Sequence, residues 1–271
     1  MMEDAAETVL AGCAGRYREF APSPGLRAHF RCAWLNEMPA GEAATMAVVP
    51  DGCVDIIWIG GRLEVAGPDV TAALSRPTPG GTIAGVRFRA GAAARWLGLT
   101  MTELVGRRVP LADIWGRRAA GLSDRIGEAG TAADRLTRLE REMEAFVPDE
   151  SPPPEATAIF GALGGGEAGI PALRDRLEIS ERSLRRRCHE SFGYGPKTLD
   201  RILRFQRFMT LVRSPDATLS GLAADSGYAD QAHLSREVKR LSRLSPAAIL
   251  RQTSFHRHHM DAGSGSGMTN Q

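Results

Sequence analysis

The stretch TLSGLAADSGYADQAHLSREVKRLS, residues 218–242, decides the fold of the second half of the chain. A short helix-forming run leads to Gly227, where the chain needs a sharp reversal, and Asp230 is a residue type that caps the start of a helix. From Leu234 to Leu241, apolar residues recur at the i, i+4, i+7 spacing that packs one helix face onto a neighbour. Two helices joined by a short turn, the second one polar and basic, have the layout of a DNA-reading helix-turn-helix unit.

The other face of the second helix carries Gln231, His233 and Arg236 near its start. Recognition helices contact base edges from this end. Glutamine suits adenine edges and arginine suits guanine O6 and N7, so we expect these three residues to be base-reading candidates.

A similar pattern occurs earlier, in IPALRDRLEISERSLRRRCHESFG, residues 170–193. Ser180 is placed to cap a second helix there. Three arginines, Arg182, Arg185 and Arg186, lie on its predicted outward face. They suit guanine reading, or phosphate binding with little sequence information, and the sequence leaves both roles open.

The run PKTLDRILRFQRFMTLVRSP, residues 196–215, predicts one long helix that starts at Pro196 and ends before Pro215. Its predicted buried stripe is Leu199, Ile202, Leu203, Phe205 or Gln206, Met209 and Val212. A rigid connecting helix fixes the separation of the two units, and successive major grooves on one face of DNA lie about 34 Å apart. One chain can therefore cover two adjacent major grooves of double-stranded DNA, with Lys197 and Lys239 as candidate phosphate contacts.

Charge is divided unevenly along the chain, although the formal net charge is only +2. Residues 1–155 hold 17 Lys and Arg against 21 Asp and Glu, whereas residues 156–258 hold 17 against 10. A basic segment is what a surface that meets phosphates requires. The length of 271 residues also exceeds the usual size of one domain, which favours two domains.

The first half is rich in short β-type runs broken by turns. Strands are predicted at 45–50, 53–60, 62–67 and 82–89, and helices at 91–98, 111–115 and 131–146. Pro50-Asp51-Gly52 and Gly60-Gly61 separate the first three runs in the manner of tight hairpins, and Thr100 with Glu103 has capping-box spacing.

We therefore predict an α+β protein with a mixed β/α sensor-like domain followed by an all-α domain of two helix-turn-helix units. The expected divisions are a sensing or dimerising domain at 1–146, a proline-rich linker at 147–155, a DNA-binding domain at 156–255 and a disordered polar tail at 256–271.

Residues 170–251 resemble the DNA-binding domain of AraC-type transcription regulators, which has seven helices. The resemblance rests on SERSLRRRCHESFGYGPKTLDRILRFQRFMTLV and on LAADSGYADQAHLSREVKRLSRLSPAAIL, with its Gly-aromatic pair and final Ser-Pro. It implies that Arg182, Arg185, Arg186, Gln231, His233 and Arg236 read bases. The family usually has Phe where Val238 stands and Gly where Arg243 stands.

The segments VVPDGCVDIIW, VAGPDV, GVRFRAGAAARWLG and PLADIWG are similar to the N-terminal domain of a subgroup of these regulators. In the family this half often binds a small-molecule effector, forms a homodimer, or does both, and an activator also contacts RNA polymerase.

Asp55 lies between apolar residues, where Arg87 or Arg89 can pair with it. A structural ion pair is one interpretation and an effector contact at Asp55, Arg87 and Arg89 is the other. Cys53 has no basic neighbour in sequence that favours a reactive thiol.

Enzyme motifs do not occur in the sequence. It has no G-x-S-x-G elbow, no G-x-x-x-x-G-K-[ST] loop and no H-E-x-x-H pair, and its four cysteines lack metal-site spacing. We expect no catalytic residues, no metal and no cofactor. The longest charge-free run is eleven residues, too short for a membrane span, and the acidic N-terminus does not resemble a secretory signal, so a cytoplasmic protein is expected.

The primary hypothesis is a sequence-specific, effector-responsive transcription regulator. The alternative is a ligand-binding or enzymatic module in residues 1–146 with an accessory DNA-binding domain.

Overall fold

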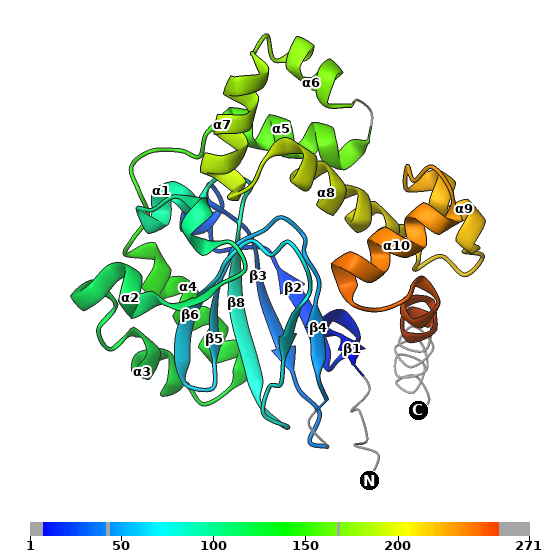
Figure 1. The fold of residues 1–271 in the computed structure, drawn as a ribbon. Coiled ribbons are helices and arrows are strands. Elements are labelled where there is room, and N and C mark those ends of the chain that lie inside the picture. The colour runs from blue at the N-terminus through cyan, green and yellow to red at the C-terminus, as the bar shows by residue number, and fades with distance from the viewer. Residues whose placement is uncertain (1–7, 42–43, 167–168, 255–271) are drawn as a thin grey trace, which may run out of the picture.

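The computed structural model describes residues 8–41, 44–166 and 169–254, so the predicted tail at 256–271 lies outside the described residues. The first half is built on two sheets and the second half is helical, which confirms the predicted fold class (Figure 1).

The strands are β1 (Val9–Leu10), β2 (Arg16–Phe20), β3 (Phe30–Glu37), β4 (Met46–Val48), β5 (Asp55–Ile59), β6 (Arg62–Ala66), β7 (Ala73–Ser75), β8 (Thr82–Phe88) and β9 (Arg108–Pro110). Six of them form an antiparallel sheet in the order β2-β3-β8-β5-β6-β9. The other three form a small sheet in the order β1-β4-β7.

The helices of the first half are α1 (Ala93–Leu97), α2 (Leu111–Trp115), α3 (Leu122–Gly127) and α4 (Ala132–Glu144), with short 3-10 helices η1 (Ala11–Cys13), η2 (Pro24–Leu26), η3 (Met101–Leu104) and η4 (Gly116–Ala119). The amphipathic helix α4 packs against β3 and β8. It lies within the helix predicted at 131–146 and buries Leu136, Leu139 and Met143. Apolar side chains from the six-stranded sheet and from α1 to α4 thus form one continuous core.

Two turns that the sequence predicts as hairpins behave differently. Gly60 and Gly61 both have positive φ angles and join β5 to β6 in a two-residue hairpin. The hairpin predicted at Pro50-Asp51-Gly52 is wrong, because β4 and β5 belong to different sheets. The capping box of Thr100 and Glu103 is confirmed, although it starts the 3-10 helix η3 and not an α-helix.

The second half comprises α5 (Pro154–Gly165), α6 (Ile170–Arg176), α7 (Glu181–Phe192), α8 (Pro196–Leu211), α9 (Leu219–Asp225) and α10 (Gln231–Ser242), followed by helical residues 246–254. The helix α5 begins inside the predicted linker. The predicted stripe of α8 is buried at Leu199, Ile202, Leu203, Phe205 and Val212, while Gln206 and Met209 are half-buried. Phe208, absent from that prediction, is fully buried as well.

The helical half packs directly on the first half. Leu10 belongs to the same buried cluster as the core of the helical half, and Val49, Ala90 and Val105 pack against that cluster. Figure 1 shows α8 running above the sheets, with α6 and α7 beyond one end of it and α9 and α10 near the other.

Candidate functional site

The first helix-turn-helix unit consists of α6 and α7. The Ser180 hydroxyl oxygen accepts a hydrogen bond from the Ser183 N–H at 3.1 Å, which caps the start of α7. Leu184 and Cys188 are fully buried against the rest of the domain. The helix ends at Gly193, whose φ of 81° suits a glycine.

The three predicted arginines of α7 are all exposed. Arg186 Nη1 lies 3.0 Å from Glu190 Oε1, one helical turn away. Arg182 and Arg185 make no hydrogen bond or ion pair within residues 8–41, 44–166 and 169–254, and their guanidinium groups are free to meet another molecule.

The second unit consists of α9 and α10. Gly227, at φ 81°, reverses the chain, and the Asp230 carboxylate accepts a hydrogen bond from the His233 N–H at 2.6 Å. Leu234, Val238 and Leu241 are buried, as the spacing predicted. These contacts fix which face of α10 is turned away from the domain.

Gln231 and Arg236 are exposed, and neither has a hydrogen bond or ion pair to any other described residue. His233 differs from them: it is half-buried, and its Nδ1 accepts a hydrogen bond from the Ala229 N–H at 3.3 Å. Its ring also meets the Tyr228 ring edge-on, with the centroids 5.3 Å apart. The side chain of His233 therefore supports the turn before α10, and base reading by it stays a prediction.

Helix α8 holds α10 in place through charged contacts that sequence reasoning missed. Arg201 Nε donates to Glu237 Oε2 at 2.7 Å. Arg204, held by Asp200 at 2.6 Å, lies over the Tyr228 ring at 5.9 Å from its centroid. The available signal was Glu237 itself, an acidic residue in a helix that is otherwise basic.

The two predicted phosphate contacts, Lys197 and Lys239, are exposed. Lys197 lies in the first turn of α8 and Lys239 in the last turn of α10. Their role stays a prediction.

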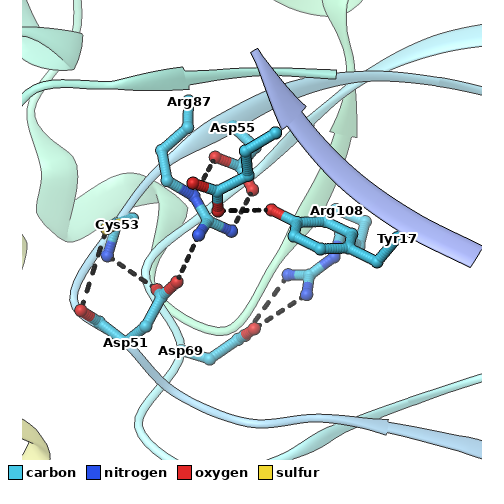
Figure 2. A network of polar contacts seen from close by, with 8 residues as sticks. Tyr17, Asp51, Cys53, Asp55, Asp69, Arg87 and Arg108 are labelled. Atoms are coloured by element: carbon cyan, nitrogen blue, oxygen red, sulfur yellow. Dashed lines mark hydrogen bonds and ion pairs between the residues drawn. The ribbon is translucent and has the colours of Figure 1, made fainter. Parts of the chain in front are cut away.

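The N-terminal domain contains a cluster of ion pairs on strands β5, β8 and β9 and on the loops beside them (Figure 2). Asp55 of β5 stands opposite Arg87 of β8 in the sheet register. Arg87 Nε and Nη2 donate to the two Asp55 carboxylate oxygens at 2.9 Å each, and Arg87 Nη1 lies 3.2 Å from Asp51 Oδ2. Beside them Arg108 Nη2 lies 2.7 Å from Asp69 Oδ2.

Burial alone would lower the pKa of the Arg87 guanidinium, but the facing carboxylates of Asp55 and Asp51 raise it well above its ordinary value. Arg87 thus stays charged, and each of its guanidinium nitrogens faces a carboxylate oxygen. Arg89 does not join this cluster, because it is exposed and its Nε donates to the Arg27 carbonyl oxygen at 2.7 Å.

The interpretation of Asp51 as a turn residue was incomplete. Its Oδ1 accepts from the Cys53 N–H at 2.9 Å, as expected of a turn aspartate, while its Oδ2 faces Arg87. The sequence did offer a signal for the pairing with Arg87, because Asp51 stands just before a strand that contains the buried Asp55. Burial, followed by the Asp51 charge, raises the pKa of the Cys53 thiol well above its ordinary value, and a protonated thiol is a poor nucleophile.

No group of metal-binding side chains occurs within the described part of the chain. Its helices include none that is long and apolar enough to cross a membrane.

Comparisons with known proteins agree with this architecture. A family model described as a helix-turn-helix domain matches residues 173–252, and one described as a domain of unknown function matches residues 18–110. The C-terminal part of the chain is therefore a helix-turn-helix domain, and the predicted class, a DNA-binding transcription regulator, is confirmed. No curated protein matches.

The chain is also similar to two solved structures. ToxT from Vibrio cholerae O395 is 12% identical with a TM-score of 0.45, and the match covers 82% of this chain and 98% of that one. A probable AraC family transcriptional regulator from Rhodopseudomonas palustris is 19% identical with a TM-score of 0.32, over 35% of this chain and 94% of that one.

Proposed function

We propose that the protein is a sequence-specific transcription regulator whose two helix-turn-helix units read adjacent major grooves of double-stranded DNA. One observation carries this proposal. The second helix of each unit leaves exposed, near its start, polar side chains without a partner among the described residues, Arg182 and Arg185 on α7 and Gln231 and Arg236 on α10. Helices enter the major groove from this end, and these are the side chains that recognise base edges and phosphates.

The N-terminal domain gives the regulator a second role. We infer that residues 1–146 sense a small-molecule effector or form a homodimer, that 147–155 connect the domains and that 156–255 bind DNA. For Asp55 and Arg87 the observed pairing supports a structural role first, so an effector would have to compete with a carboxylate for Arg87. Effector contact by Arg89 would involve a separate, exposed surface.

The same proposal places the protein in the cytoplasm, gives it no catalytic activity and makes RNA polymerase its partner if it activates transcription. A polar reading surface on both units and the absence of enzyme motifs from the sequence support this proposal.

The test compares two arginines of α10. Arg236→Ala should cost about 1–3 kcal/mol of discrimination between the preferred site and a scrambled duplex. Arg240→Ala is the matched control, because Arg240 is exposed near the other end of the helix and lies 4.0 Å from Glu237. It should weaken binding to both duplexes equally. Fluorescence anisotropy at one fixed salt concentration measures both, and an unchanged sequence preference in Arg236→Ala would contradict the proposal.

A further inference from the structure

The turn formed by residues 50–52, here called the interdomain turn, is packed against the DNA-binding domain. Gly52 has a φ of 78°, and a Cβ atom on it would lie 3.0 Å from Phe160 Cε2 and 3.5 Å from Leu199 Cδ1. Gln206 Nε2 of α8 donates to the Pro50 carbonyl oxygen at 2.7 Å. The turn therefore touches both α5 and α8.

The same turn holds the least tightly bound member of the ion-pair cluster. Asp55 makes two contacts of 2.9 Å with Arg87, whereas Asp51 makes one at 3.2 Å. The side chain of Asp51 is also 29% exposed, against 12% for Asp55. Because buried pairs with good geometry are the hardest to break, Asp51 is the carboxylate that Arg87 releases most easily.

A hydroxyl group on the other side of the turn is unsatisfied. Tyr194 is 6% exposed, and its O–H has no hydrogen-bond partner among the described residues. The oxygen lies 3.6 Å from the position that a Cβ atom on residue 52 would take, next to Asp51 in the chain. A buried donor without a partner costs free energy, so an acceptor that can reach it would be favoured.

The charge of Asp51 already acts on this hydroxyl. Burial and then the Asp51 carboxylate raise the pKa of Tyr194, so the phenol remains a protonated donor at neutral pH. Tyr194 lies between the end of α7 at Phe192 and the start of α8 at Pro196. A new bond to it would act on the joint between the first recognition helix and the connecting helix.

We propose that the Asp51 carboxylate is a two-position contact between the domains: it pairs with Arg87 in the arrangement described here, and it turns to the Tyr194 hydroxyl when its hold on Arg87 is weakened. The proposal rests on the proposed function, since its consequence is a change in DNA binding. In the arrangement described here both reading faces are exposed. The second position acts on the joint between α7 and α8, so we expect it to lower affinity for a DNA site that needs both units.

The experiment uses the full chain and the DNA site that it selects. Asp51→Asn leaves the buried Asp55–Arg87 pair intact, removes the charge that binds Arg87 and keeps an oxygen that can accept from Tyr194. We expect the Kd for the two-element site to rise at least threefold. Adding Tyr194→Phe removes the second position and should restore the wild-type Kd.

Three further variants separate this switch from a general loosening of the contact between the domains. In an Asp51→Ala background, which has no side-chain acceptor at residue 51, Tyr194→Phe should leave the Kd unchanged. Glu142→Gln is the matched control, because Glu142 is paired with Arg125 between α3 and α4, away from the interdomain turn, and its Kd should equal that of the wild type.

Failure of this inference is distinguishable from failure of the proposed function. If the wild type binds its site specifically and Asp51→Asn binds equally well, or is not restored by Tyr194→Phe, the inference is overturned and the proposed function stands. If the wild type has no specific site, the proposed function fails, and amide hydrogen exchange decides the inference. In that case faster exchange over 192–199 in Asp51→Asn, reversed by Tyr194→Phe, supports it, and unchanged exchange overturns it.

Discussion

The two helix-turn-helix units share a backbone design but present different chemistry. In both, a side-chain oxygen caps the second helix, from Ser180 in one and Asp230 in the other. Both second helices end in a left-handed residue. The first unit presents arginines, whereas the second presents an amide and a guanidinium, Gln231 and Arg236. The comparison teaches that packing fixes the helices similarly, while the exposed residues decide what each can recognise.

The largest effects should come from the shared packing. Leu184 of α7 and Leu234 of α10 are both fully buried, and truncation to Ala should cost about 2–5 kcal/mol of unfolding free energy at either position. Urea unfolding followed by circular dichroism measures both variants. A loss for one leucine alone would break the comparison, because it would show that only one unit depends on its second helix for stability.

Substitutions of exposed residues should have different effects on DNA binding in the two units. Gln231→Ala should cost about 1–3 kcal/mol at the preferred site and relax the preference at one base pair. Arg182→Ala and Arg185→Ala, if these arginines bind phosphates, should weaken binding to every sequence and reduce the salt slope by about one unit each. Titrations of specific and scrambled duplexes at several salt concentrations measure both quantities. A base preference lost in Arg182→Ala would assign guanine reading to the first unit.

Substitutions at the residues that end α7 and α10 should change the unfolding free energy in opposite directions. Arg243, at φ 64°, occupies the left-handed position that Gly193 fills in the first unit, so Arg243→Gly should raise the unfolding free energy by about 0.5–1 kcal/mol. Gly193→Ala should lower it, since a Cβ there would lie 2.5 Å from Val105 Cγ2 and 2.7 Å from the Met101 carbonyl oxygen. Thermal unfolding of the two variants checks the signs, and destabilisation by Arg243→Gly would contradict the relief of backbone strain.

The smallest effects concern Lys197, which follows the first unit, and Lys239, which lies within the second. Each Lys→Ala change should flatten the logarithmic salt dependence of binding by about one unit and leave the sequence preference intact. Thr210→Ala is a suitable control because Thr210 is an exposed, uncharged residue of α8. If a Lys→Ala variant keeps the wild-type salt dependence, that lysine does not contact phosphate.

The helical half was largely predictable because its signals are local. Caps such as Asp230, the reversal at Gly227 and the spacing from Leu234 to Leu241 act within a few residues of chain. The sheets were harder. The long strand β3 is buried on both faces for most of its length, so it lacks the alternation that marks a half-buried strand, and the edge strand β2 is mostly polar.

The candidate sites divide in the same way, into residues placed by a local pattern and contacts placed by the fold. Exposure of Gln231 and Arg236 followed from helical periodicity. The pairing of Asp55 with Arg87 was predicted, but the choice over Arg89 depends on β8 ending at Phe88, which only the fold decides. Contact between the interdomain turn and Gln206 joins residues 156 positions apart, and no local pattern carries it.

Selection from random genomic DNA tests the central claim most directly. Purified full-length protein is mixed with genomic fragments at one near-physiological salt concentration, and bound fragments are sequenced. Two units fixed by α8 predict enrichment of a site with two elements about one helical turn apart, and a relaxed preference at one base pair of one element in Gln231→Ala. Equal recovery of all fragments, or a site with a single element that Gln231→Ala leaves unchanged, would contradict sequence-specific reading by both units.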